Sequence, residues 1–595
     1  MSARIDLAWL ESGGQQGVWP LGEVLAVPSV ACRIASALKR RLERSNAEAW
    51  LFWDPSLGPP KRDVVLDAFT VPGDLWHAGL RLGAGGLPRT MDAVHPTWML
   101  NRDTDPDIEA TAWRLSLRAC LVRTEVLRQM GGPRADFLTL EGAALEMGHR
   151  YITRGVLMRH LPRLVAKSRT PNSELRTPIS LPFEDELRFA YYRFGKKWSA
   201  WALFRSLMLR RVSLGEAMKA ARRVWQSPRP PEPPPFRALT TRNSPLPAPC
   251  SDLPTSSSQL PSATPSVTVL IPTLDRYPYL RTLLSQLRDQ TISPLEIIVV
   301  DQTLAARRDT RLAADFSDLP LRLLHQDEPG QCTSRNAGLQ IAQGDYILFL
   351  DDDDEVKPDL IEAHLNNLAR CQADVSSGVA EEVGAGPLPE NFRIIRASDV
   401  LPTCNTLLRR EVLVRSGLFD LAYNRGQRAD GDLGMRIYLS GAVMVLNPAV
   451  SVLHHHAPSG GLRAHKARVV TYASSRTRLT HRQLLSATEI YLARRYFSAE
   501  QSRESLWLAV LGTFSVRGGL LRKMVKAGFG FVCIPHTLWR LRKASLEATG
   551  MLVDGPEIPV LAGDIRSRLS AESVQKLAPS ESECVLASDS PLGKG

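Results

Sequence analysis

The chain has 595 residues, of which 44% are hydrophobic and 23% are charged, and its formal net charge is +12. This length exceeds what one ordinary core contains, and the hydrophobic fraction excludes a wholly disordered chain, so we expect two or more globular domains. The sequence contains no run of about 18 apolar residues, which argues against a membrane-spanning helix.

The excess of positive charge suits an acidic nucleotide, an anionic lipid surface or a nucleic acid as partner. We exclude nucleic acid, because the sequence contains no zinc-finger spacing, basic-region heptad or aromatic RNA-binding strand. The first residues lack the basic start and apolar run of a signal peptide, and the eight cysteines show no spacing typical of disulfides or zinc sites. These features predict a cytoplasmic chain with reduced cysteines.

The expected organisation alternates folded and low-complexity segments. Residues 1–165 are predicted to form an α/β domain, and residues 166–225 a helical segment. Residues 226–265 begin with SPRPPEPPP and continue in Ser, Thr and Pro; since proline fixes φ and removes a backbone donor, we expect an extended linker. Residues 546–595 are rich in Ser, Glu and Ala and are predicted to be a disordered tail.

Apolar runs and helical patterns alternate within residues 266–465. Strands are predicted at residues 267–271, 295–300, 321–324 and 346–350, and helices at residues 279–290 and 332–342. Strands separated by helical segments of about 10 to 15 residues indicate a mostly parallel sheet with helices on both faces. Ligands of such sheets lie at the carboxyl ends of the strands, so the polar residues there are candidate site residues.

Acidic side chains follow two of these strands. Asp301 ends the second predicted strand, and four consecutive aspartates, residues 351–354, follow the fourth. Four adjacent carboxylates repel one another, and a bound divalent cation would offset that repulsion. A solvated acidic loop is the alternative interpretation.

A second group of residues suits phosphate. Arg335 and Asn336 open the helix that precedes the aspartate-rich strand. The N-terminus of a helix together with an arginine is a ready site for phosphate oxygens. A cation site beside a phosphate site indicates a metal-bridged nucleotide diphosphate.

Downstream, the sequence ADGDLGMR begins at Ala429 and predicts a helix that Gly441 closes. Asp430 lies at the start of this helix, where a simple N-cap is the alternative to a chemical role. A strand at residues 443–446 then leads to three histidines at residues 454–456, for which an exposed loop is the alternative interpretation.

Together these segments resemble a family 2 glycosyltransferase of GT-A fold. The motifs that carry the resemblance are VTVLIPT (267–273), EIIVVD (296–301), RNAG (335–338) and GDYILFLDDDD (344–354), and they cover about a third of the chain with their surroundings. The resemblance implies a Rossmann-like, mostly parallel sheet. It also implies an inverting transferase that moves a sugar from a nucleotide diphosphate to a glycan or lipid-linked acceptor, in cell-envelope or polysaccharide synthesis.

The resemblance assigns the donor site residue by residue. Thr273 and Asp301, with Pro272 beside them, would contact the base and ribose, and Arg335 and Asn336 would contact the diphosphate.

The resemblance also implies a metal, Mn²⁺ or Mg²⁺, and a catalytic base. Asp351 and Asp353 map to the Asp-x-Asp motif, with Asp353 as the main metal ligand, and Asp352 enters the donor site because the register can shift by one residue. His454 would bind the metal or the diphosphate. Asp430 would be the base that accepts the proton of the acceptor hydroxyl.

Two departures from the family pattern are Gln302, where a second acidic residue is common, and Ala429, where a Glu is common. Asp432 and Arg436 are expected to form structural hydrogen bonds. Two other functions stay open: a nucleotidyltransferase of similar fold, which would usually carry a glycine-rich loop with an arginine after the first strand, and an inactive GT-A-like binding or scaffold protein.

The N-terminal region repeats the second half of this domain. LVRTEVL (121–127) parallels LLRREVL (407–413), and the same spacing of 286 residues pairs Arg150 with Arg436 but Ala144 with Asp430. Upstream, AWLFWD (49–54) resembles YILFLD (346–351). We interpret residues 1–165 as a degenerate GT-A-like domain without catalysis, and we expect too few residues before residue 49 for the nucleotide-binding strands.

Residues 466–545 are predicted to be basic amphipathic helices with aromatic side chains, among them Trp539. Such helices often rest on anionic membrane surfaces. Contact with the inner face of the cell membrane and packing against the catalytic domain are the two alternatives.

Overall fold

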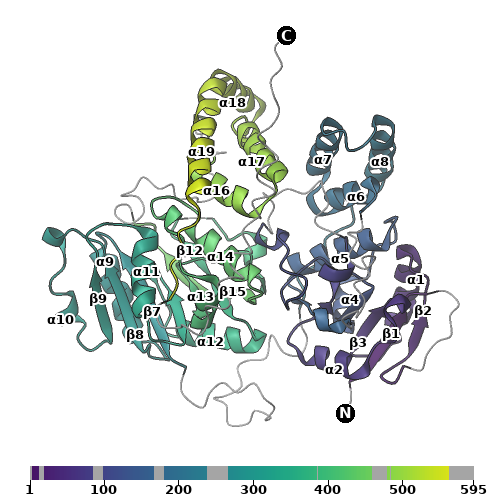
Figure 1. The fold of residues 1–595 in the computed structure, drawn as a ribbon, viewed down its shortest axis with the longest axis horizontal. Coiled ribbons are helices and arrows are strands. Elements are labelled where there is room, and N and C mark those ends of the chain that lie inside the picture. The colour runs from purple at the N-terminus through teal and green to yellow at the C-terminus, as the bar shows by residue number, and fades with distance from the viewer. Residues whose placement is uncertain are drawn as a thin grey trace. The chain divides into compact units, whose positions relative to one another are not determined.

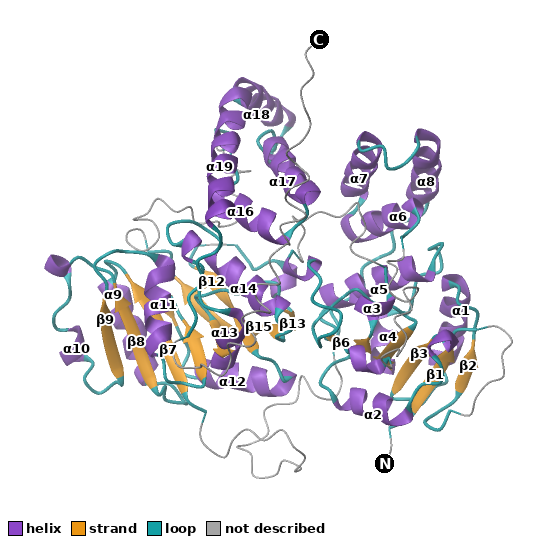
Figure 2. Cartoon of the chain, in the orientation of Figure 1, coloured by secondary structure: helices purple, strands orange, loops and turns teal. Residues whose placement is uncertain are grey.

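A computed structural model of the chain describes residues 3–11, 19–84, 98–165, 180–237, 265–384, 386–457, 479–480, 482 and 484–561. The described residues form an α/β protein with two sheets, as Figures 1 and 2 show. The predicted α/β class is therefore confirmed.

The first sheet lies in the N-terminal half and has the strand order β2-β1-β3-β5-β4-β6. Its helices pack on a core around Leu51, Trp76 and Leu121, which are fully buried. The strands are β1 (Ile5–Trp9), β2 (Val24–Ala26), β3 (Ala49–Trp53), β4 (Leu75–His77), β5 (Ala119–Arg123) and β6 (Met158–His160), and the main helices are α1 (Ala31–Leu42), α2 (Arg62–Thr70), α3 (Gly79–Leu82), α4 (Thr124–Met130) and α5 (Leu140–Thr153).

The second sheet has the strand order β11-β15-β12-β14-β10-β7-β8-β9, and β13 (Arg396–Ala397) pairs with β15. Strands β9, β8, β7 and β10 are parallel, whereas β14 is antiparallel to β10. The strands are β7 (Val267–Thr273), β8 (Glu296–Asp301), β9 (Leu321–His325), β10 (Tyr346–Phe349), β11 (Asp354–Glu355), β12 (Val375–Glu382), β14 (Thr406–Arg409) and β15 (Met444–His454).

The helices around the second sheet are α9 (Tyr277–Arg288), α10 (Leu312–Asp315), α11 (Gln331–Ile341), α12 (Leu360–Cys371), α13 (Arg410–Ser416) and α14 (Ala429–Leu439). Three of them, α9, α11 and α14, begin close to where the sequence predicts them. Gly441 has φ +85, a left-handed conformation that favours glycine and ends the α14 segment.

The two sheets share one strand order. The first sheet, β2-β1-β3-β5-β4-β6, corresponds strand for strand to β8-β7-β10-β14-β12-β15 of the second. The registers agree as well, because Leu51 lies opposite Leu121 in the first sheet and Leu348 lies opposite Leu407 in the second. The repeat inferred from the sequence motifs is thus present in the backbone topology.

One expectation about this repeat was wrong. β1 and β2 precede residue 49 and occupy the places of β7 and β8, so the first half does contain the strands that we expected to be absent. They fit because β1 has 5 residues and β2 only 3. Among the described residues, the first sheet contains no counterpart of β9 or β11.

Each half contains a buried arginine that binds a carboxylate on its own helix and two backbone carbonyls of the preceding chain. Arg436 on α14 donates from Nε to Asp432 Oδ2 at 2.9 Å, from Nη2 to the carbonyl of Leu418 at 2.7 Å and from Nη1 to the carbonyl of Ser416. Asp432 and Arg436 thus form structural hydrogen bonds, as predicted, and one of these bonds joins the two residues.

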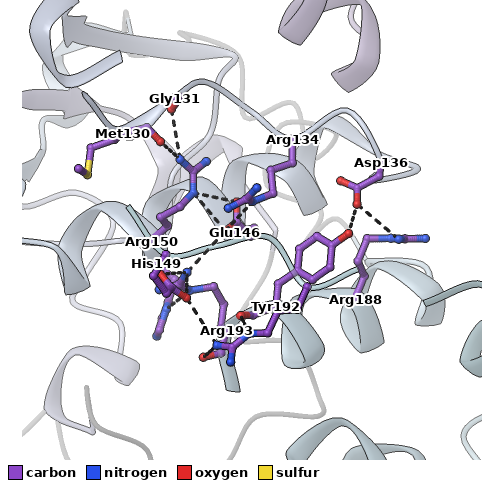
Figure 3. Close-up of polar contacts among 12 residues, drawn as sticks. Met130, Gly131, Arg134, Asp136, Glu146, His149, Arg150, Arg188, Tyr192 and Arg193 are labelled. Carbon is purple, nitrogen blue, oxygen red and sulfur yellow. Dashed lines mark hydrogen bonds and ion pairs between the residues drawn. The ribbon is translucent and has the colours of Figure 1, made fainter. Parts of the chain in front are cut away.

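Arg150 on α5 makes the equivalent contacts in the first half, and Figure 3 shows those with Glu146 and Met130. It donates to Glu146 Oε1 at 3.1 Å, to the carbonyl of Gly132 at 2.9 Å and to the carbonyl of Met130. Each of these residues precedes its counterpart by 286 positions. Further arginines reach both carboxylates: Arg134 and Arg193 form ion pairs with Glu146, and Arg495 forms one with Asp432.

A group of helices follows each sheet. α6 (Phe183–Phe194), α7 (Lys196–Met208) and α8 (Leu214–Gln226) follow the first, and α16 (Ala487–Tyr496), α17 (Ala499–Gly512), α18 (Leu520–Val532) and α19 (Ile534–Asp554) follow the second. Within the described part of the chain, no helix combines the length and apolar character needed to span a bilayer.

The segments around these helices differ partly from the predicted boundaries. Residues 227–237 of the predicted linker are extended but packed, because the backbone N–H of Phe236 donates to the carbonyl of Arg154 and Glu232 pairs with Arg193. The predicted tail begins later than residue 546, since α19 continues to Asp554. Residues 166–179, 238–264, 458–478 and 562–595, which include other parts of the predicted segments, lie outside the described residues.

Replacement of Arg150 by Met tests the buried arginine. Glu146 would lose its closest partner and two backbone carbonyls would lose their donor, so we expect the free energy of unfolding of the first half to fall by about 3 to 5 kcal/mol. Tryptophan fluorescence during urea unfolding reports this half, because only Trp507 and Trp539 of the 12 tryptophans lie beyond Trp225. Arg40→Met changes an exposed arginine on α1 and serves as the control; equal midpoints for both variants would contradict the role of Arg150.

Candidate active site

The carboxyl ends of β7 and β8 bring the first two predicted residues together. Thr273 lies directly opposite Asp301 in the parallel register, and both are buried. Asp301 accepts a hydrogen bond from the Tyr277 hydroxyl at 2.7 Å and one from the backbone N–H of Thr303 at 2.9 Å. Pro272, one residue earlier in β7, is only partly buried.

The helix α11 places Arg335 at the end of β10. A Cβ atom on Gly338 would lie 2.3 Å from Leu270 Cδ1, so the glycine allows α11 to pack closely on β7. From this position Arg335 Nη2 donates to Asp351 Oδ1 at 2.9 Å. The predicted phosphate-binding arginine and the first predicted aspartate are therefore direct neighbours.

Asn336 lies one residue further along α11 and has a different environment. Its Nδ2 donates to the carbonyl of Phe419 at 2.8 Å, and its Oδ1 accepts from the N–H of Phe419 at 2.9 Å. These two bonds tie α11 to the chain before α14. The side chain acts as a structural link here, and its contact with the donor stays a prediction.

Asp352 points back toward β7. Its carboxylate accepts hydrogen bonds from Thr273 Oγ1 at 2.8 Å and from Arg276 Nη1 at 3.0 Å. Burial raises the pKa of Asp352 to about 7, although the charge of Arg276 opposes the rise. Asp352 thus connects the acidic segment to the end of β7.

Asp353 shares the same arginine. Arg276 Nη1 also lies 3.0 Å from Asp353 Oδ1, and Asp353 Oδ2 accepts from the N–H of Ala457 at 2.7 Å. Only 1% of the Asp353 side chain is exposed, whereas 30% of the Asp351 side chain is exposed. Of the two residues of the predicted Asp-x-Asp motif, Asp351 is therefore the more accessible to a ligand.

Asp354 and His454 form the next pair, in the antiparallel register of β11 with β15. His454 Nδ1 lies 2.8 Å from Asp354 Oδ1 and 3.8 Å from Asp353 Oδ1. Burial alone would lower the pKa of His454, but the hydrogen bond and the charge of Asp354 raise it above its ordinary value. His454 is thus held at the acidic segment, where the resemblance implies it.

Three protein cations accompany the four aspartates. Arg335 pairs with Asp351, Arg276 with Asp352 and Asp353, and His454 with Asp354. The side chains of the protein therefore offset much of the repulsion that the sequence suggested a metal would relieve. An exposed loop of acidic residues does not describe this segment, because residues 352–354 are buried.

The residues at this segment fit a cation that takes part of its coordination from a substrate. Among the described residues, no three His, Cys, Asp or Glu side chains are grouped as a complete metal site. Mg²⁺ and similar cations are commonly held by one or two carboxylates together with substrate phosphates, so a complete protein site is not required. The partly exposed carboxylate of Asp351, beside Arg335, meets that lesser requirement.

Asp430 lies in the first turn of α14, and its side chain is exposed. Burial raises the pKa of the Cys404 thiol well above its ordinary value, and the negative charges of Asp354, Asp351 and Asp430 add to the rise. The charge of the predicted base and the charges of the acidic segment thus act on the same thiol.

Sequence reasoning missed three residues of this site: Arg276, Tyr277 and Cys404. Arg276 and Tyr277 lie three and four residues after the end of the VTVLIPT motif, and that position was the available signal for them. Cys404 belongs to no motif. The departure at Gln302 also has a structural explanation, because its Oε1 accepts from the N–H of Gly330 at 2.7 Å and holds the start of α11.

Comparisons with known proteins find glycosyltransferases. Residues 268–428 match the model of the family described as glycosyl transferase family 2. A putative glycosyltransferase, EpsH of Bacillus subtilis (strain 168), is 35% identical over 104 residues, which are 17% of this chain and 30% of that protein. The GalNAc(5)-diNAcBac-PP-undecaprenol beta-1,3-glucosyltransferase of Campylobacter jejuni is 32% identical over 97 residues, which are 16% of this chain and 31% of that protein.

Each of these matches thus spans about a third of the relative's length. Similar solved structures include the mannosyltransferase PcManGT from Pyrobaculum calidifontis in complex with GDP-Man and Mn²⁺, at 19% identity and a TM-score of 0.31, over 50% of this chain and 88% of that one. S. aureus TarS 1-349 in complex with UDP has 16% identity and a TM-score of 0.29, over 44% of this chain and 70% of that one. The sequence match and the motifs placed in this sheet thus identify residues 268–428 as the region of the chain that is similar to glycosyl transferase family 2.

Proposed function

We propose that the second half of the chain is an inverting glycosyltransferase that moves a sugar from a nucleotide diphosphate to an acceptor hydroxyl. The observation that supports this most directly is the arrangement of Arg335, Asp351 and Asp430. Arg335, a cation for phosphate, pairs with Asp351, an accessible carboxylate for a metal, at the end of β10, and Asp430 is an exposed carboxylate for a base at the start of α14. Each of these three tasks belongs to glycosyl transfer from a charged donor.

The donor would lie along the ends of β7, β8 and β10. Thr273 and Asp301 face each other there, which suits the base and ribose, with Pro272 at the same strand end and Asp352 bound to Thr273. Arg335 would bind the diphosphate, and Asn336 would support it through its link to Phe419.

The chain's carboxylates would hold Mn²⁺ or Mg²⁺ at Asp351 and Asp353, with His454 beside them. A bound divalent cation supplies positive charge against the charge that develops on the leaving diphosphate. Arg335 adds a fixed positive charge at the same place, and a fixed charge needs no reorganisation during the reaction.

Asp430 would accept the proton of the acceptor hydroxyl as that oxygen attacks the anomeric carbon. Its exposure suits this role, because the acceptor must reach it from solvent. One base without a nucleophilic partner implies inversion of the anomeric configuration, since no covalent sugar intermediate forms.

We also propose a glycan or lipid-linked acceptor, in cell-envelope or polysaccharide synthesis, at the cytoplasmic face of the membrane. The match to the GalNAc(5)-diNAcBac-PP-undecaprenol beta-1,3-glucosyltransferase supports this class of acceptor. Contact with the membrane surface would place the active site near such an acceptor. The family match favours glycosyl transfer over nucleotidyl transfer, and the paired charges of the acidic segment favour an active enzyme over a scaffold.

Asp430→Asn tests the base. Donor binding should be nearly unchanged, whereas hydrolysis of a nucleotide sugar, in which water replaces the acceptor, should fall about a hundredfold or more. Hydrolysis is measured on a panel of nucleotide sugars with Mn²⁺, and binding by thermal shift with the same compounds. Asp359→Asn, an exposed aspartate just before α12, is the control. If Asp430→Asn hydrolyses the donor as fast as the control does, Asp430 is not the base.

Asp351→Asn and Asp353→Asn, made separately, test the metal site. Mn²⁺ together with a nucleotide diphosphate should raise the unfolding midpoint of the wild-type chain, because both bind the folded state. We expect each variant to weaken the Mn²⁺-dependent part of nucleotide binding by at least about tenfold, a loss that removal of a mere partner of a metal ligand already causes. The variant with the greater loss identifies the main ligand. Equal nucleotide affinity with Mn²⁺ and with a chelator, in the wild-type chain, would refute metal use.

A further inference from the structure

The helix α18 exposes a continuous apolar face. Leu521 is 76% exposed and Val532 is 82% exposed, and the other large exposed apolar residues of the helix are Leu520, Met524, Val525 and Phe531. With 3.6 residues per turn, these positions fall on one side of the helix along its whole length. Burial of such a face against something outside the helix would be favourable.

The opposite side of α18 holds the helix in place. Lys526 is fully buried there and its Nζ donates to the carbonyl of Leu479 at 2.8 Å, and a Cβ atom on Gly530 would lie 2.7 Å from the Phe514 ring. These contacts fix the orientation of α18, so that its apolar face points outward. In Figure 1, α18 lies at the end of the α16–α19 group that is furthest from the sheet.

Basic side chains border the apolar face on both sides. Arg522 and Lys523 are exposed and lie on opposite flanks of it, as the helical period requires. Over α18 and α19 as a whole, six basic residues stand against two acidic ones: Arg522, Lys523, Lys526, Arg540, Arg542 and Lys543 against Glu547 and Asp554. An apolar face with cations on its flanks matches a lipid surface, where the apolar side chains enter the acyl boundary and the cations reach anionic headgroups.

A second copy of the chain is a poorer occupant of this face. A symmetric contact through α18 would bring the Arg522 and Lys523 side chains of two copies close together, and like charges at an interface rim disfavour association. Trp539 on α19 and Trp507 on α17 are also exposed, at 61% and 62%. Exposed tryptophan in a basic helical group is typical of proteins that rest at the boundary between lipid and water.

The helices after the first sheet expose a similar set. Met208 and Leu209 at the end of α7 and Leu214 and Met218 at the start of α8 are largely exposed, and Arg210 and Arg211 lie between them. The apolar and basic combination is thus present in both helical groups of the repeat. Its recurrence indicates a use for the feature, because exposed apolar side chains of this size are costly in a soluble segment.

We propose that the outer face of α18 docks on an anionic membrane surface, lying in the plane of the headgroups without spanning the bilayer. The proposal gives the membrane contact of the proposed function a defined location. It rests on that membrane contact and on no other part of the proposed function. It uses none of the residues assigned to sugar transfer, so lipid binding and donor hydrolysis can fail separately.

Co-sedimentation of the full chain with vesicles tests the docking face. Wild-type protein should bind vesicles of phosphatidylglycerol and phosphatidylcholine and should bind pure phosphatidylcholine vesicles more weakly. The triple variant Leu521→Gln, Met524→Gln and Phe531→Gln should bind the anionic vesicles at least about tenfold more weakly, because it removes buried apolar area. Arg522→Gln with Lys523→Gln should weaken binding about fivefold for each cation removed and should abolish the preference for anionic lipid.

Leu304→Gln, an exposed leucine in the loop after β8, is the matched control and should bind as the wild type does. Circular dichroism and donor hydrolysis verify that each variant is folded, and hydrolysis should be unchanged in all of them. Unaltered vesicle binding by the folded triple variant would overturn the proposal. So would a wild-type chain that ignores anionic vesicles but forms a dimer which the triple variant loses, because a second copy would then occupy the face.

Discussion

The confinement of four carboxylates to the end of one buried strand is the constraint on which the second half of the chain depends. Residues 352–354 are buried, and each carboxylate is accompanied by a cation, a hydroxyl or a backbone N–H. The partners come from separate parts of the chain: Arg276 follows β7, Arg335 lies on α11 and His454 ends β15. To hold this charge, the fold must bring the ends of β7, β10 and β15 together with α11. The same arrangement gathers the residues of the candidate site.

The balance of charge also explains how the site can accept a donor. Arg335 pairs with Asp351, the most exposed aspartate of the segment, whereas Arg276 lies against the buried Asp352 and Asp353. A diphosphate with a divalent cation can take over both members of the Arg335–Asp351 pair, because it offers oxygens to the arginine and a cation to the carboxylate. Asp352 can stay bound to Thr273 and Arg276, whereas Asp353, in the proposed metal site, would share its carboxylate between Arg276 and the cation.

Sequence patterns predicted the parts of this fold that have a local cause. The parallel strands from β7 to β10, the helix α11 and the start of α14 follow from apolar runs, helical period and glycines, and all lie within a few residues of their predicted positions. The partners of each site residue could not be predicted in this way, because Arg276, Cys404 and His454 reach the aspartates only through tertiary packing. The same limit explains β1 and β2: short strands leave little local pattern, and their neighbours in the sheet identify them.

The first half keeps the frame of the second half without its acidic segment. Arg150 keeps every contact of Arg436, including a buried carboxylate one turn earlier, and the strand order of the sheet is retained. At the end of β3, by contrast, Asp54 pairs with Arg118 and is followed by Pro55 and Ser56, so a single ion pair replaces the acidic segment. Ala144 stands where the second half has Asp430. An arginine that ties this helix to the preceding chain stabilises the fold, and each half contains one. A cluster of buried carboxylates, in contrast, is costly unless a substrate uses it. The first half accordingly keeps the shared frame, with Arg150 and the strand order, and has no counterpart of the acidic segment at the end of β3.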